Sequence, residues 1–291
     1  MIEIIDGEPE RIENNLRVAT ANMTQLWNYS GKTLFDQYIK WVNSQVRMFA
    51  GIISARDVDQ MFQTRGYWSL RSSDPSSLGE NLTTTIHREL EAQKHAIEVA
   101  ADGIRDERKR WEGHGKAPIA LVLDTGVVEA FADRLLEADW HEVADIRPHR
   151  FLYLVVPRIV LDELDRHKQS RDNGAQSKAR RMKARAAVKS LWAMFGAKDI
   201  FPTFCREDKT PTEQGGFELL NDDIDHVQLS DPDAELLARS RALFAYLPVK
   251  VVTFDTGMAL RGMASGIDVV LAAEPDEVDE LKPPAIAPEG Q

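Results

Sequence analysis

The chain has 291 residues, 43% of them hydrophobic, and a net charge of −11, which is enough for one large or two ordinary folded domains. Its one cysteine, Cys205, excludes an intramolecular disulfide and a multi-cysteine zinc site, so any metal would be held by oxygen or imidazole. No stretch reaches the roughly 20 uninterrupted apolar residues of a membrane helix, and the first residues are acidic, so we expect a cytoplasmic protein.

Residues 1–115 are predicted to form a separate helical domain, because apolar residues recur there at spacings of three and four. One long helix is expected to run from Leu82 to Trp111, and Ser54 has the position of a helix cap. Residues 65–81 are rich in Gly, Pro and Ser and are predicted to be a loop. The aromatic residues favour a core over a base-stacking surface. The domain could form a homo-oligomer, recruit an inhibitor protein as in toxin–antitoxin pairs, or select substrates.

The pattern changes at residues 113–118, and a second domain is predicted over residues 116–273. Short apolar runs typical of buried strands alternate there with helical segments. Strands are expected at 119–125, 151–157, near 200 and at 249–255, and helices at 127–138, 159–168, 176–195, 232–243 and from 255 through Met263. This alternation predicts an α/β fold, a parallel sheet with helices on both faces, in which functional groups gather at the carboxyl ends of the strands. The acidic, Pro-rich residues 274–291 are expected to be disordered.

Four acidic residues fall where such a sheet places its chemistry. Asp124 and Asp255 end the first and last of these strands, Glu163 lies one turn into a helix, and Asp233 begins another helix. Carboxylates that converge in a cleft repel one another unless a cation such as Mg²⁺ or Mn²⁺ neutralises them. Each acid also has a simpler explanation. Asp124 and Asp255 could only cap helices, Glu163 could be a surface charge, and Asp231 competes with Asp233 for one role.

The motifs around these acids resemble the PIN-domain family over residues 117–272. They read VLDTGVV, VPRIVLDELDRHK, SDPDAELLARS and VVTFDTGMALRGMASGI. The resemblance implies that the four acids bind one or two divalent metals, Mg²⁺ or Mn²⁺. It implies a PIN-like endoribonuclease that hydrolyses RNA phosphodiester bonds with a metal-activated water. Thr125 and Thr253 would support the neighbouring acids. Asp231 stays open as the third ligand, although Asp233 is preferred because its spacing from Leu236 puts the carboxylate beside a core-facing side chain.

A basic segment on this acidic chain offers a surface for RNA. Ten basic and four acidic residues lie between Arg158 and Lys189. The helix at 176–195 is expected to have Met182, Ala186, Val188 and Trp192 available for burial, although an ordinary amphipathic helix with a solvated face explains the pattern equally well. The residues expected to contact RNA, in single-stranded form, are Arg158, Arg166, His167, Lys168, Lys178, Arg181 and Arg185.

Two further hypotheses compete with a ribonuclease. The domain could be an inactive PIN-fold scaffold, against which the presence of all four acids weighs, or a related nuclease that acts on DNA. A phosphatase with an aspartyl nucleophile would need an Asp-x-Asp pattern, and the segment LDTGV at residues 123–127 has no second Asp. RNA is preferred by family analogy, because no residue pattern reads a 2′-hydroxyl.

Overall fold

The computed structural model of the chain divides into two compact units, Met1–Gly113 and His114–Gln291. It describes residues 2–112, 117–170, 174–196, 203–204, 215–222 and 226–275. Residues 113–116 of the predicted boundary, the predicted strand near residue 200 and residues 276–291 of the predicted tail lie outside the described residues. Within the described part, no helix combines the length and the apolar composition needed to cross a membrane.

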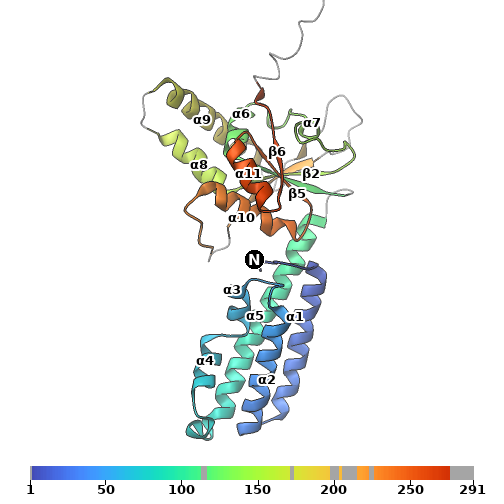
Figure 1. The fold of residues 1–291 in the computed structure, drawn as a ribbon, viewed down its shortest axis with the longest axis vertical. Helices are drawn as coiled ribbons and strands as arrows, with labels where there is room; N and C mark the ends of the chain where they lie inside the picture. Colours follow the sequence, from blue (N-terminus) through green and yellow to red (C-terminus); the bar gives the residue numbers. More distant parts are fainter. Residues whose placement is uncertain are drawn as a thin grey trace, which may run out of the picture. The chain divides into compact units, whose positions relative to one another are not determined.

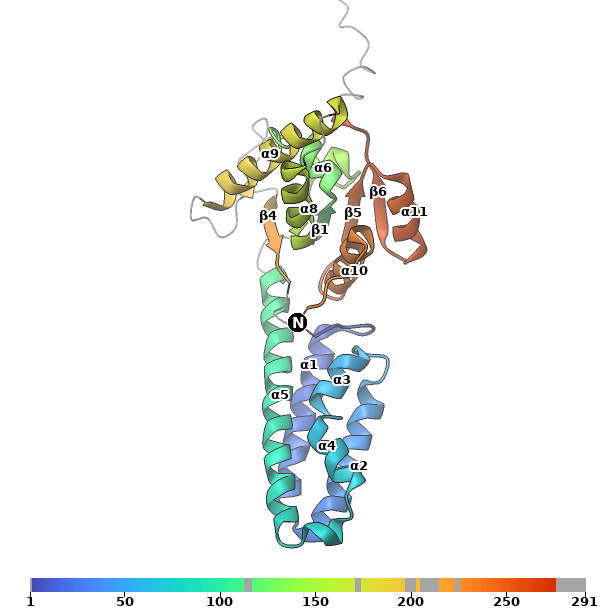
Figure 2. The same cartoon turned by 90° about the vertical axis from the view of Figure 1, so that its left-hand side faces the viewer.

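The N-terminal unit is helical, as predicted. Its longest helix, α5, runs from Asn81 to Glu112 and buries the predicted apolar face, which includes Leu82, Ile97 and Trp111. Figures 1 and 2 show α1 and α2 packed alongside α5. The remaining elements of this unit are α1 (Pro9–Met23), η1 (Thr24–Asn28), α2 (Gly31–Phe49), α3 (Ala55–Met61), α4 (Arg65–Ser72) and η2 (Pro75–Leu78).

Helix caps account for one prediction that is confirmed in this unit and for one that is wrong. Ser54 caps α3 as predicted, accepting a hydrogen bond from the Asp57 backbone N–H. The prediction of a loop over residues 65–81 is wrong, because α4 and η2 lie there. Thr64 caps α4 by accepting from the Tyr67 N–H, and the Tyr67 side chain is fully buried. The cap and the burial of an aromatic ring outweigh the low helix propensity of Gly66.

The second unit is an α/β domain with a parallel sheet flanked by helices, which confirms the predicted fold class. Within the described residues, its six strands have the order β3-β4-β2-β1-β5-β6, and all neighbours are parallel except the short β3, which is antiparallel to β4. The strands are β1 (Ile119–Leu123), β2 (Leu152–Pro157), β3 (Thr203–Phe204), β4 (Gly215–Leu220), β5 (Val249–Thr253) and β6 (Asp268–Leu271). The helices are α6 (Thr125–Ala130), α7 (Trp140–Val143), α8 (Arg158–Gln169), α9 (Ala175–Gly196), α10 (Pro232–Phe244) and α11 (Thr256–Ala264).

The structure corrects the sequence prediction in two elements of this sheet domain. The helix predicted over 127–138 is the shorter α6, which begins at Thr125 because Asp124 is its N-cap and which ends at Ala130. Strand β4 has no counterpart among the predicted elements, yet it pairs with β2 along its whole length, from Gly215 to Leu220. The run GGFELL is short and carries Glu218, so it lacks the continuous apolar character of β1 and β2.

Helix α9 buries a different face from the predicted one. The prediction that Met182, Ala186, Val188 and Trp192 are available for burial is wrong for Met182 and Trp192, which are 70% and 77% exposed, while Ala186 and Val188 are half-buried. The buried residues are instead Ala184, Ala187, Leu191 and Met194. Small alanines at the contact let the helix lie close to its neighbours α6 and α8, and the larger side chains are left on the outer surface.

Candidate active site

A cavity of about 420 Å³ lies at the carboxyl ends of β1 and β5 and collects acidic side chains from four separate segments. Asp124 follows β1 and Asp255 follows β5, at the rim where parallel sheets place functional groups. Glu163 reaches the same cavity from α8, and Asp233 reaches it from the first turn of α10. All four of the predicted acids therefore line one cavity.

Asp124 is held by both of its carboxylate oxygens. Oδ1 accepts a 2.6 Å hydrogen bond from the Thr125 N–H, and Oδ2 accepts a 2.8 Å bond from the Thr253 hydroxyl. The pKa of Asp124 is raised to about 6; burial is the largest cause, the two hydrogen bonds oppose the rise, and the nearby charges of Asp233 and Glu163 add to it. The cavity therefore disfavours the concentration of negative charge that its own residues create.

The two threonines predicted to support the acids both contact carboxylates or their backbone. Thr253 is fully buried; its hydroxyl donates to Asp124 and accepts a 2.9 Å bond from the Asp255 N–H. Pairing of Leu123 with Val252 brings the ends of β1 and β5 side by side and makes this bridge possible. On the other side of the cavity, the Thr125 hydroxyl donates a 2.6 Å bond to Glu163. The threonines thus fix carboxylates in place without adding positive charge.

Asp231 and Asp233 take different positions. Asp233 lines the cavity, whereas Asp231 is the N-cap residue of α10 and is absent from the cavity lining. Arg261 of α11 contacts both, with its Nη1 at 3.1 Å from Asp231 and its Nη2 hydrogen-bonded to Asp233. The geometry therefore favours Asp233 as the third acid of the cavity.

The cavity also contains charged residues that the sequence prediction missed, namely Glu129, Arg180, Lys183 and Glu274. Glu129 is buried, and its carboxylate lies 2.7 Å from His167 Nδ1 and 3.7 Å from Arg180 Nε. An acid on the buried side of α6 is the sequence signal that could have identified Glu129, because an uncompensated buried charge is costly. Its partners lie on other helices and could not be named from spacing alone.

The residues predicted to bind RNA differ in their surroundings. Three of them, Lys168, Arg181 and Arg185, line a second cavity of about 610 Å³ together with Gln169 and Ser170. Arg166 and Lys178 are exposed. Arg158 Nε lies 3.7 Å from Asp162 and 4.0 Å from Asp222. The side chain of His167 is only 16% exposed and is engaged by Glu129, so it offers little free surface.

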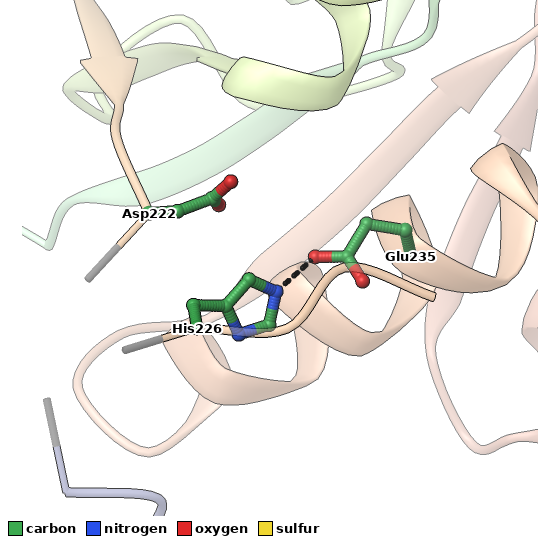
Figure 3. Close-up of side chains that lie close together, drawn as sticks. All are labelled: Asp222, His226 and Glu235. Carbon is green, nitrogen blue, oxygen red and sulfur yellow. Dashed lines mark hydrogen bonds and ion pairs between the residues drawn. The ribbon is translucent and has the colours of Figure 1, made fainter. Parts of the chain in front are cut away.

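A separate cluster of Asp222, His226 and Glu235 joins the end of β4 to the first turn of α10 (Figure 3). Its ligand atoms lie within 4.8 Å of one another, a spacing that could hold a metal, whereas within the described residues no three of the cavity acids lie so close together. His226 Nε2 is 2.6 Å from Glu235, whose other oxygen accepts from the Leu229 N–H, and Asp222 lies 3.6 Å from Arg239 Nε. Existing protein partners therefore already satisfy these carboxylates.

The comparisons agree with this arrangement. The family model of the PIN domain matches residues 121–272, which is more than half of the chain and spans all four cavity acids. No curated protein matches the chain. With a matching family model, a parallel sheet flanked by helices, and the four motif acids at one end of it, the chain belongs to the PIN-domain family.

Proposed function

We propose that this protein is a Mg²⁺- or Mn²⁺-dependent endoribonuclease that hydrolyses phosphodiester bonds. The observation that carries the proposal is the single cavity lined by Asp124, Glu163, Asp233 and Asp255 in a PIN domain, a family whose members are generally divalent-metal-dependent nucleases. The choice of RNA over DNA rests on the family resemblance and is part of the test.

The chemistry of the cavity suits a hard divalent cation. Its candidate ligands are carboxylate oxygens, which Mg²⁺ and Mn²⁺ prefer. The raised pKa of Asp124 reflects burial and mutual repulsion, and a cation would relieve both. Asp124, Asp233 and Asp255 would hold one ion, and Glu163 would face a second. A bound ion of this kind supplies Lewis-acid stabilisation of charge on phosphate oxygens and lowers the pKa of a water ligand.

The protein's own contribution is to preorganise the ligands. The Thr253 hydroxyl fixes Asp124 and the backbone of Asp255 relative to each other, and the Asp255 carboxylate accepts a 2.9 Å bond from the Met258 N–H. These bonds hold the side chains before substrate arrives, so little reorganisation is needed during reaction. Arg261 donates a hydrogen bond to the Asp233 carboxylate, and it would release or share that carboxylate when an ion binds.

The basic residues of α8 and α9 would bind the RNA strand. The cavity lined by Lys168, Arg181 and Arg185 would bind backbone phosphates, with Arg166 and Lys178 adding charge on the exposed surface. Arg158 and His167 would contribute less, because acids already engage them. For the N-terminal unit, the expected roles in self-association or inhibitor binding remain proposals, and sedimentation of the full chain tests the first.

The deciding experiment compares cleavage of single-stranded RNA and single-stranded DNA by the native protein in Mg²⁺, Mn²⁺ or EDTA. Asp124→Asn is the test variant, and Asp133→Asn, an exposed acid outside the cavity, is the matched control. We expect metal-dependent RNA cleavage that Asp124→Asn lowers by about 100-fold or more and that Asp133→Asn leaves unchanged. Preference for DNA would redirect the substrate assignment. Absence of cleavage on either substrate would favour the scaffold hypothesis.

A further inference from the structure

Glu129 differs from Asp124 and Glu163 in the groups that contact its carboxylate. Asp124 and Glu163 are held by hydroxyl and backbone groups, which add no positive charge. Glu129 has an imidazole on one oxygen and a guanidinium near the other, from His167 at 2.7 Å and Arg180 at 3.7 Å. A carboxylate that is 7% exposed and already contacted by an imidazole and a guanidinium is a poor candidate for another metal ligand. It is better suited to holding its neighbours.

Arg180 is the neighbour that reaches solvent. It stands on α9, which packs against both α6 and α8, and its side chain is 60% exposed although Glu129 engages it. Its side chain also lines the cavity of the four motif acids. The contact with Glu129 is made through Nε, on one side of the planar guanidinium. A guanidinium paired through Nε leaves its Nη groups available as a fork that matches the oxygens of a phosphate.

A cation is needed at this position if a nucleic acid is cut here. A phosphate that enters a cavity lined by several carboxylates is repelled by every one that metal ions do not neutralise. Lys183, one turn further along α9, adds a second cation to the same lining. The lining therefore combines the acids proposed to hold metal ions with two cations from α9.

We infer that Arg180 binds the phosphate group that is cut, and that the pair of buried Glu129 and partly buried His167 positions Arg180 for that contact. The inference rests on the proposed nuclease function and names a residue of that site outside the four PIN motifs. Arg180 is thereby a catalytic residue, because it contacts the reacting group. Glu129 and His167 are positioning residues that act through it.

The test measures steady-state cleavage of a fluorescent single-stranded RNA by Arg180→Ala and Arg180→Lys. Lys189→Ala, which removes an exposed cation from the same helix outside the cavity, is the matched control. We expect Arg180→Ala to lower kcat/KM by about 100-fold, the size of effect seen when one preorganised donor to a reacting oxygen is removed. Arg180→Lys should restore only part of the activity, because lysine keeps the charge and loses the fork.

Binding supplies an independent measurement. In the Asp124→Asn background, where RNA stays intact, addition of Arg180→Ala should reduce the slope of log affinity against log salt by about 0.7, the value for one lost single-strand phosphate contact. Equal kcat/KM and an equal salt slope for Arg180→Ala, in a native protein that cuts RNA, would overturn the inference and leave the nuclease function standing. A native protein that cuts neither RNA nor DNA would overturn both.

The positioning role is tested with Glu129→Gln, which keeps the size of the side chain and removes its charge. We expect kcat/KM to fall by about 10-fold in the native background and to change little in the Arg180→Ala background, because coupled residues are non-additive. A merely structural role for Glu129 would lower activity by the same factor in both backgrounds, and that result would contradict the assignment. The melting temperature of each variant separates loss of positioning from loss of folding.

Discussion

Asp124 is the residue whose charge state links stability to pH. Burial raises its pKa in the folded protein to about 6, above its ordinary value of 3.8, so protonation favours the folded state. Without divalent ions, this stabilisation is fully present below pH 3.8 and is lost as pH rises through 6. The charged form of Asp124 therefore destabilises the folded, metal-free protein at neutral pH.

In EDTA at pH 7.5, we expect Asp124→Asn to be more stable to urea than the native protein by about 3 kcal/mol, from the size of the pKa shift. The advantage should shrink as pH falls toward 3.8. Asp133→Asn, at an exposed position, serves as the control and should match the native protein. A native protein that equals Asp124→Asn at pH 7.5 would mean that the cavity does not strain this carboxylate.

Substitutions of Asp231 and Asp233, the two acids at the start of α10, should have different effects on cleavage activity. Asp233→Asn removes a carboxylate from the cavity lining and should lower kcat/KM by about 100-fold or more. Asp231→Asn removes only the ion pair with Arg261 outside the lining, and its effect should be much smaller. Steady-state cleavage assays of both variants in Mn²⁺ make the comparison. The opposite order of effects would assign the third ligand to Asp231.

Some secondary-structure elements of the PIN domain could be predicted from their own sequences, and others could not. The strands β1 and β2 are buried on both faces, so their sequences are continuous apolar runs from which the strands could be predicted. Strand β4 has a short mixed run, and its pairing with β2 depends on chain that lies far away in sequence. The motif acids could be predicted because each follows a strand or lies within the first two turns of a helix, whereas the contact of Glu129 with His167 could not, because the two residues are 38 positions apart.

The packing of α11 on β6 leaves no room for a side chain at Gly262. A Cβ there would lie 2.5 Å from Val269 Cγ2 and 3.2 Å from Leu237 Cδ2. We expect Gly262→Ala to lower the free energy of unfolding by about 1–3 kcal/mol through overpacking. Gly103→Ala on α5 is the matched control, because its Cβ meets nothing within 4 Å, and it should stabilise by about 0.4–1 kcal/mol. Urea unfolding measures both, and equal effects would contradict the packing argument.

The segment before α10 depends on the cluster in Figure 3. Glu235 is 1% exposed and loses its imidazole partner in His226→Ala, which should lower stability by about 1–3 kcal/mol. Because Asp233 lies on the same turn, cleavage should also slow. Urea unfolding and cleavage assays test this, with the exposed His149→Ala as control. Zn²⁺ that stabilises the native protein and not His226→Ala would instead identify a metal site.

At the scale of the whole molecule, the two compact units predict two unfolding steps. Each unit has its own buried core, and the acids of the cavity all belong to the second. Saturating Mn²⁺ at about 100 times its dissociation constant should stabilise only the PIN unit, by about 2.7 kcal/mol. Differential scanning calorimetry with and without Mn²⁺ measures this, and Asp124→Asn should abolish the shift. A single transition, or a shift in both steps, would contradict it.

The hydrogen bond between Thr253 and Asp124 joins residues that are 129 positions apart in the chain. During synthesis on a ribosome, β1 emerges long before β5. Asp124 is therefore made before the Thr253 hydroxyl that binds it and before Asp255. The cleft acquires its full set of acids only once β5 has left the exit tunnel and paired with β1. Under the proposed ribonuclease function, a growing polypeptide of this kind would be inactive toward the message from which it is being translated.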